Sequence, residues 1–190
     1  MKQKDQLGDY VNFLHEVGML AHTPRSGFPF LGSGQQSVAE HSFRVAFIGY
    51  TLAKLIKDQK INEHKLMMMC LLHDLPEART GDLNHLNKKY VQSNEAQAVQ
   101  DIRKAYPFGE EIATFLEELK SGQSLESKLA HDADKLELLL FLRREQENGN
   151  TRAPQWFARC EAFLETDCAK DLAKKIHSTP SDAWYLGFMA

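Results

Sequence analysis

Cysteine is scarce in this chain, which also lacks a basic block and a long apolar run. Cys70, Cys160 and Cys168 are an odd number without paired metal-ligand spacing, which is typical of reduced thiols rather than a disulfide framework or structural zinc. The formal net charge of −3 excludes a strong electrostatic footprint for polymeric nucleic acid. The strongest apolar run, residues 66–72, is far too short to cross a bilayer, and residues 1–5 lack the apolar stretch of a signal peptide. We therefore expect a cytoplasmic protein with no membrane and no polymeric nucleic acid as partner.

No segment alternates apolar and polar residues with the period of a strand, whereas apolar residues recur at helical spacing almost everywhere. A chain of 190 residues with 43% hydrophobic residues has the length of one domain and can bury a sizeable core. These features predict an all-α, compact helical bundle that forms a single domain over residues 1–190. Its core is expected at about 10–141, and a C-terminal helix with a docking tail at about 154–190.

Caps and breaks predict where the helices begin and end. The first helix is expected over about Asp5 to Leu20, with a buried stripe that comprises Leu7, Tyr10, Val11, Leu14 and Val17. A loop at 22–36 ends in a capping box, Ser37 to Glu40, so the second helix should begin near Val38. Its core-facing stripe comprises Val38, His41, Val45, Ile48, Leu52 and Leu55.

The third helix should begin after Asn62 and end or bend at Pro76. Further helices are expected near 92–105, 108–120, 125–147 and 154–176. The tail at 184–189 is apolar enough to dock on the domain or on a partner subunit.

Four polar residues stand out because they interrupt the apolar stripes of these helices: His41, His73, Asp74 and Asp134. Two imidazoles and two carboxylates suit a divalent cation such as Mn²⁺, Co²⁺ or Mg²⁺, with Zn²⁺ as a further candidate. Four protein ligands leave open positions on an octahedral ion for water and substrate. Taken alone, His41 is more often a hydrogen-bonded core residue, and Asp74 could instead cap the turn around Pro76. The metal site is favoured because it would satisfy all four residues together.

A second His-Asp pair, His131-Asp132, competes with these residues. Asp132 has Lys128 and Lys135 within one helical turn, which predicts a solvated ion-pairing face. The turn-neighbours of Asp134 are instead apolar, so its carboxylate is expected to bind a cation. We therefore predict Asp134 as the ligand.

The motifs around these residues resemble those of the HD-domain metal-dependent phosphohydrolases. The matching stretches include Ser37 to His41, Leu71 to Glu77, Gly81-Asp82 and Ala133 to Leu136. With His22-Thr23-Pro24-Arg25, the sequence looks most like the small single-domain group that includes the 5'-deoxynucleotidases. The resemblance runs from about Tyr10 to about Phe141.

The resemblance implies roles for residues that the spacing alone leaves open. Glu77 would position or activate the attacking water, Asp82 would face the substrate near the sugar and leaving oxygen, and Arg25 would hold the phosphate. The family's bacterial deoxynucleotidases have a tryptophan directly after that arginine, whereas this chain has Ser26, so selection against ribose is in doubt. Phe28 could supply an aromatic wall instead. The resembling family is commonly dimeric, which predicts a homodimer.

The sequence thus predicts a metal-dependent phosphoric monoester hydrolase, a 5'-nucleotidase that acts on (deoxy)nucleoside 5'-monophosphates. One rival is a phosphodiesterase or a nucleoside triphosphate hydrolase on the same fold. Such enzymes call for extra metal ligands or several convergent cations, which the motifs do not visibly provide. Another rival is a non-catalytic nucleotide-binding protein that the metal stabilises.

Overall fold

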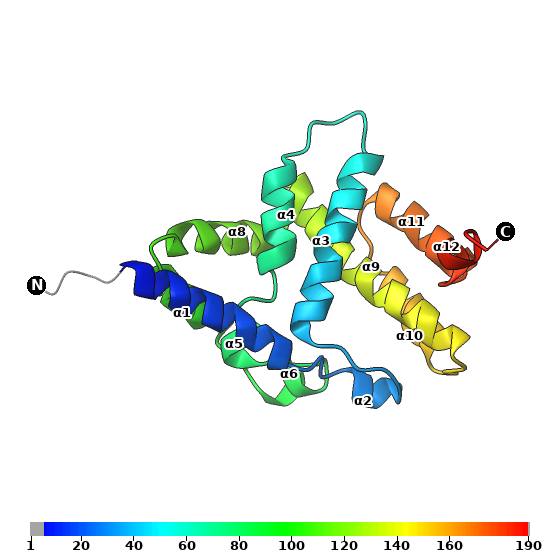
Figure 1. Ribbon diagram of the computed structural model, residues 1–190, viewed down its shortest axis with the longest axis horizontal. Coiled ribbons are helices and arrows are strands. Elements are labelled where there is room, and N and C mark those ends of the chain that lie inside the picture. The colour runs from blue at the N-terminus through cyan, green and yellow to red at the C-terminus, as the bar shows by residue number, and fades with distance from the viewer. Residues whose placement is uncertain (1–5, 190) are drawn as a thin grey trace, which may run out of the picture.

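The protein is built from helices, as its computed structural model shows for residues 6–189 (Figure 1). In chain order the elements are α1 (Gln6–Met19), the 3-10 turn η1 (Leu20–His22), α2 (Phe28–Leu31), α3 (Val38–Leu55), α4 (Glu63–Leu72), α5 (Glu77–Thr80), α6 (Asn87–Tyr90), α7 (Glu95–Ala105), α8 (Gly109–Ser121), α9 (Leu125–Glu147), α10 (Ala153–Glu161), α11 (Asp167–Ser178) and α12 (Ala183–Leu186). Within residues 6–189 there is no strand, and a single isolated bridge pairs Pro24 with Ser37. The all-α prediction is confirmed. None of the helices described is long and apolar enough to cross a membrane.

Helix α9 is the central element of the bundle. It packs against α3, α4, α8, α10 and α11, and Figure 1 shows α3 crossing in front of it with α4 alongside. Leu129, Leu136, Leu139 and Leu142 of α9 are fully buried and belong to the main core cluster. Burial of each such side chain contributes about 1.5–3 kcal/mol. Packing of the central helices therefore fixes the positions of the polar side chains that they carry.

Helix α3 begins where the capping box predicts. The Ser37 side chain accepts a hydrogen bond from the Glu40 N–H, and the Glu40 side chain accepts one from the Ser37 N–H. This reciprocal cap fixes the register of the helix and turns His41 toward the core, where its side chain is 0% exposed. The predicted stripe of α3 is buried except for Leu55, which is exposed because α3 ends there.

Helix α1 packs differently from the prediction. All five members of its predicted buried stripe are exposed: Leu7, Tyr10, Val11, Leu14 and Val17. The helix contacts the bundle instead through Phe13, whose ring packs edge-on against Tyr106 and Phe108, and through an ion pair of Glu16 with Arg79. The Tyr10 ring also lies 5.2 Å from that of Phe108, although Tyr10 stays 45% exposed. Aromatic contacts and the Glu16 ion pair thus anchor α1, and the prediction of a buried stripe was wrong. Asp5, its predicted first residue, lies outside the described residues.

The C-terminal region also differs from the prediction. The single helix expected at 154–176 is two helices, α10 and α11, because Asp132 accepts hydrogen bonds from the Glu165 and Thr166 N–H groups at 2.9 and 2.8 Å and stabilises a break between them. The apolar side chains of the tail are exposed in the single chain: Trp184, Tyr185, Leu186, Phe188 and Met189. Of the two predicted docking surfaces, the domain does not cover them, and a partner subunit stays a prediction.

Candidate metal centre

His41 enters the site from the second turn of α3. Its Nδ1 atom lies 2.7 Å from Glu137 Oε2, and both side chains are fully buried. Its Nε2 atom faces the opposite way, 3.1 Å from His73 Nε2 and 3.0 Å from Asp134 Oδ1. The ring is therefore held by one nitrogen and presents the other to the centre of the site.

His73 and Asp74 lie at the end of α4. Helix α4 ends at Leu72, and His73 occupies the cap position with helical backbone angles. The His73 Nδ1 atom lies 2.8 Å from the Cys70 carbonyl oxygen, so its Nε2 atom also faces the centre, 3.2 Å from Asp74 Oδ2. Both histidines thus show the same pattern, in which a protein acceptor binds Nδ1 and leaves Nε2 free for a cation.

Asp134 and Asp132 of α9 lie in opposite environments. Asp134 faces the site with a side chain that is 40% exposed. Asp132 is 0% exposed and caps the α10–α11 break through Glu165 and Thr166, so the predicted solvated face of Asp132 was wrong. The carboxylate of Asp132 is satisfied mainly by the two backbone N–H groups and by the Thr166 hydroxyl, whereas the predicted partner Lys135 lies at 3.8 Å. Asp134 is the carboxylate of this pair that lies beside His41.

The donor set fits a divalent cation. Ligand atoms of His41, His73 and Asp134 all lie within 4.8 Å of one another. Asp74 Oδ2 lies beside this group, 3.7 Å from His41 Nε2, and it also pairs with Arg25. Two ring nitrogens only 3.1 Å apart require a proton or a cation between them or on one of them. Mixed nitrogen and carboxylate donors around such a point suit a borderline cation.

The carboxylates around the centre give it a negative electrostatic potential, which changes the pKa values of its side chains. Burial alone would lower the pKa of His73, but the charge of Asp74 and its hydrogen bond raise it to about 9. The pKa of His41 is also raised, because the hydrogen bonds of Asp134 and Glu137 outweigh burial. Burial would raise the pKa of Asp134, but the His41 hydrogen bond and the nearby positive charges hold it well below its usual range. These shifts show that the centre attracts positive charge.

Arg25 reaches the centre from the loop before α3. The loop backbone is fixed by the Arg25 N–H, which donates to the Gln36 carbonyl at 2.9 Å, next to the Pro24–Ser37 bridge. Its guanidinium then donates to Asp74 Oδ2 at 3.0 Å. This contact uses one of five N–H donors, so the others remain for an anion next to the centre.

Glu77 begins the one-turn helix α5, three residues after Asp74. Its Oε2 atom is buried and has no hydrogen-bond partner among residues 6–189. Burial, followed by repulsion from Asp74 and Asp82, raises the pKa of Glu77 to about 9. A buried carboxyl oxygen without a partner is costly and points to a group that residues 6–189 do not supply.

Asp82 and Phe28 lie at the loops around Arg25. The Ser26 N–H donates to Asp82 Oδ2 at 2.6 Å, so Asp82 ties its own loop to the one that carries Arg25. Phe28 is 6% exposed and stacks on Phe141 with ring centroids 4.3 Å apart. Phe28 and Arg25 also line one pocket of about 970 Å³. Most of the Phe28 ring surface is used for packing, which leaves little of it to contact a substrate.

Glu137 was missed from the sequence. It lies one turn after Asp134 on α9, on the same face, and a glutamate in the middle of an apolar helix stripe is the signal that marks it. His22, which belongs to the motif with Arg25, lines the 970 Å³ pocket without a contact to the centre.

A family model described as HD domain matches residues 17–177 of this chain. The human protein named 5'-deoxynucleotidase HDDC2 is 28% identical over 136 residues, which cover 68% of this chain and 65% of the human protein. The 5'-deoxynucleotidase hdd1 of Schizosaccharomyces pombe is 27% identical over 158 residues, which cover 77% of this chain and 78% of that protein. A crystal structure from Pyrococcus horikoshii superposes with a TM-score of 0.76 at 26% identity and covers 88% of this chain and 98% of that one.

Proposed function

The chain belongs to the HD-domain family, and from this premise we propose that it is a metal-dependent phosphohydrolase that releases phosphate from nucleoside 5'-monophosphates. The observation that carries the proposal is the convergence of His41, His73 and Asp134, with the Asp74–Arg25 pair beside them. Relatives named 5'-deoxynucleotidase support the nucleotide class.

In this proposal His41, His73, Asp74 and Asp134 hold the cation. Their nitrogen and oxygen donors favour Mn²⁺, Co²⁺ or Mg²⁺, with Zn²⁺ as a further candidate. When bound, such an ion neutralises charge on a phosphoryl oxygen and lowers the pKa of water at the site.

The side chains around the centre would bind the phosphate, orient the attacking water and contact the leaving group. Arg25 binds the phosphate through the guanidinium donors that Asp74 does not use, and so orients the phosphorus for in-line attack. Glu77 offers Oε2 to orient the attacking water. It takes the proton of that water once a cation at the centre offsets the repulsion from Asp74 and Asp82 that raises its pKa. Asp82 holds the Arg25 loop through Ser26. In the proposal, Asp82 also hydrogen-bonds the sugar or the departing 5' oxygen.

The loop after Arg25 bears on sugar selectivity. Ser26 is a small residue there, and Phe28 packs on Phe141 rather than standing free. We propose that the enzyme accepts deoxyribonucleotides and that its discrimination against ribose is weak, because no bulky side chain follows Arg25 directly.

A substrate panel tests this function. Metal-stripped protein, resupplied with Co²⁺, Mn²⁺, Mg²⁺ or Zn²⁺, is assayed for phosphate release from deoxy- and ribonucleoside 5'-monophosphates, with cyclic diesters and triphosphates in parallel. The proposal expects metal-dependent release from the monophosphates. Turnover confined to diesters or triphosphates would replace it with those chemistries, and binding without any turnover would favour a metal-stabilised nucleotide-binding protein.

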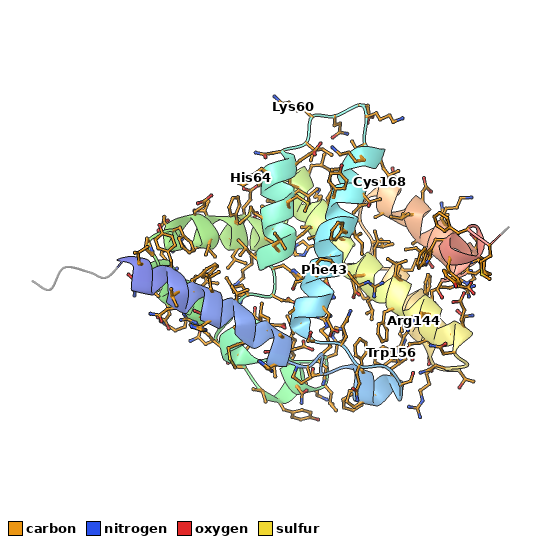
Figure 2. The ribbon with its side chains drawn as sticks, viewed as in Figure 1. Phe43, Lys60, His64, Arg144, Trp156 and Cys168 are labelled. Carbon is orange, nitrogen blue, oxygen red and sulfur yellow. The ribbon has the colours of Figure 1, made fainter. Side chains whose placement is uncertain are left out.

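We also propose a cytoplasmic homodimer. Apolar side chains are exposed on α1, on the tail, and on α3, where Phe43 and Phe47 are 63% and 59% exposed. Figure 2 labels Phe43 on α3 and Arg144 on α9, which line the same shallow pocket. A second copy would cover part of this surface. A monomeric mass in solution at micromolar concentration would contradict the dimer.

A further inference from the structure

Glu137 is a buried carboxylate that joins His41 of the metal centre to Gln36 and Arg44 on the outer side of the His41 ring. It lies on α9 and is 1% exposed. Its Oε2 atom lies 2.7 Å from His41 Nδ1. Its Oε1 atom accepts a hydrogen bond from Gln36 Nε2 at 2.8 Å and forms an ion pair with Arg44 Nη1 at 2.8 Å. Glu137 lies at the Nδ1 side of the His41 ring, whereas the cation would bind at Nε2, so Glu137 is not itself a ligand.

The contact decides which nitrogen of His41 carries a proton. An ionised carboxylate offers only acceptors, so a separation of 2.7 Å from Nδ1 requires the proton on Nδ1. In the neutral ring the lone pair then lies on Nε2, the atom that faces His73 and Asp134. A carboxylate in this position also makes the imidazole a stronger donor to a cation.

We propose that Glu137 is a positioning residue that holds His41 as its Nδ1–H tautomer and so presents Nε2 to the cation. Arg44 and Gln36 fix Glu137 in this orientation. The inference rests on the proposed metal centre, but it concerns affinity for the ion rather than turnover.

The two histidines differ in a way that makes the role testable. His73 is held by the Cys70 backbone carbonyl, which no substitution removes. His41 is held by a side chain, so its orientation depends on the identity of residue 137. A purely structural Glu137–Arg44 ion pair would affect stability without any preference for the metal.

The experiment measures Co²⁺ affinity of metal-stripped protein by competition with a chromophoric chelator, together with the melting temperature of the metal-free form. The variants are Glu137→Ala and Glu137→Gln, with Glu145→Gln as the matched control. Glu145 is another buried glutamate of α9, 8% exposed, whose carboxylate binds Ser33. We expect Glu137→Ala to weaken Co²⁺ binding about 10- to 100-fold. Glu137→Gln should weaken it less, because its amide oxygen still accepts from Nδ1–H, and Glu145→Gln should leave the affinity unchanged.

A second readout reports the tautomer directly. In the Zn²⁺-loaded protein, nitrogen-edited NMR should show a slowly exchanging Nδ1–H of His41 in the parent and in Glu137→Gln, and its loss in Glu137→Ala. The inference is overturned if Glu137→Ala keeps the parent affinity, or if Glu145→Gln weakens Co²⁺ binding as much for the same loss of melting temperature. A parent protein that binds Co²⁺ but hydrolyses no nucleotide would refute the proposed function and leave this inference standing. Normal turnover with unchanged Co²⁺ affinity in Glu137→Ala would refute this inference and leave the proposed function standing.

Discussion

The helical side and the loop side of the site are built by different means. Long helices with continuous hydrogen bonding and buried stripes position His41 and Asp134. A few bonds between loops position Arg25 and Asp82, such as the 2.6 Å contact from the Ser26 N–H to Asp82. Helices fix side chains through packing over many residues, whereas loops depend on single contacts. The comparison suggests a rigid ion-binding half and a more adjustable half that sets substrate preference.

The largest effect is expected on the helical side. Asp134→Asn should lower kcat/KM for phosphate release by about 10³-fold or more, because a cation contributes several kcal/mol to the transition state. It should also abolish the rise in melting temperature on addition of metal.

Asp132→Asn is the matched control on the same helix. It should cost about 1–3 kcal/mol of unfolding free energy, because Asp132 is 0% exposed and holds the Glu165 and Thr166 N–H groups, yet metal affinity should persist. Metal-dependent turnover that survives Asp134→Asn and disappears in Asp132→Asn would reverse the assignment of the ligand.

On the loop side, Arg25→Met should lower kcat/KM about 10- to 100-fold, the equivalent of about 1.5–3 kcal/mol for a charge-assisted hydrogen bond. Metal affinity should not fall, because the substitution releases Asp74 from its ion pair with Arg25. Arg25→Lys should retain part of the activity, since lysine keeps the charge without the bidentate fork. Equal losses of metal affinity and turnover would show that the two halves are not separable.

Protons should compete with the metal at the helical side. The pKa of His73 in the metal-free protein is raised to about 9, above its ordinary value of 6.5. The charged imidazole therefore stabilises the metal-free fold at low pH, and this stabilisation is lost as pH rises through about 9. Metal requires the neutral ring, so affinity and the metal-induced rise in melting temperature should both increase from pH 6.5 toward 9. Calorimetric titration at several pH values measures both the affinity and the released protons, and an affinity that falls over this range would contradict the account.

The smallest effect is expected from Asn84→Ala. Asn84 donates to the Ser26 carbonyl at 3.1 Å and caps the turn at Leu86 and Asn87. Loss of such a bond costs about 0.5–1.5 kcal/mol, so KM for a nucleotide should rise a few-fold while Co²⁺ affinity stays the same. An unchanged KM would show that the Ser26 loop does not depend on this contact.

The helical side could largely be predicted from the sequence. The Ser37–Glu40 box and the spacing of apolar residues give both the start of α3 and the inward direction of His41. The environment of Asp132 could not be predicted, because its partners Glu165 and Thr166 come from a distant segment. The spacing of Asp132 and its neighbouring lysines along α9 predicts only contacts within that helix, so it could not predict the contact with Glu165 and Thr166.

Other features depend on contacts that periodicity does not encode. The stripe of α1 is apolar at helical spacing, yet the helix packs through Phe13 and Glu16, because tertiary geometry decides which face is covered. In the loop site, Arg25 was predicted from the resemblance to the family. The hydrogen bond between Ser26 and Asp82 joins residues 56 positions apart, so no local pattern in the sequence predicts it. The roles of the site residues, and a single domain over the whole chain, stay predictions.

The central claim is that one cation held by the helical side drives turnover of a phosphate held by the loop side. The most direct test titrates Co²⁺ into metal-stripped protein while phosphate release from deoxyadenosine 5'-monophosphate is recorded, with Asp134→Asn measured in parallel. The account predicts no release from the stripped protein, activity that saturates at about one ion per chain, and no recovery in the variant. Turnover without metal, or equal recovery in Asp134→Asn, would contradict it.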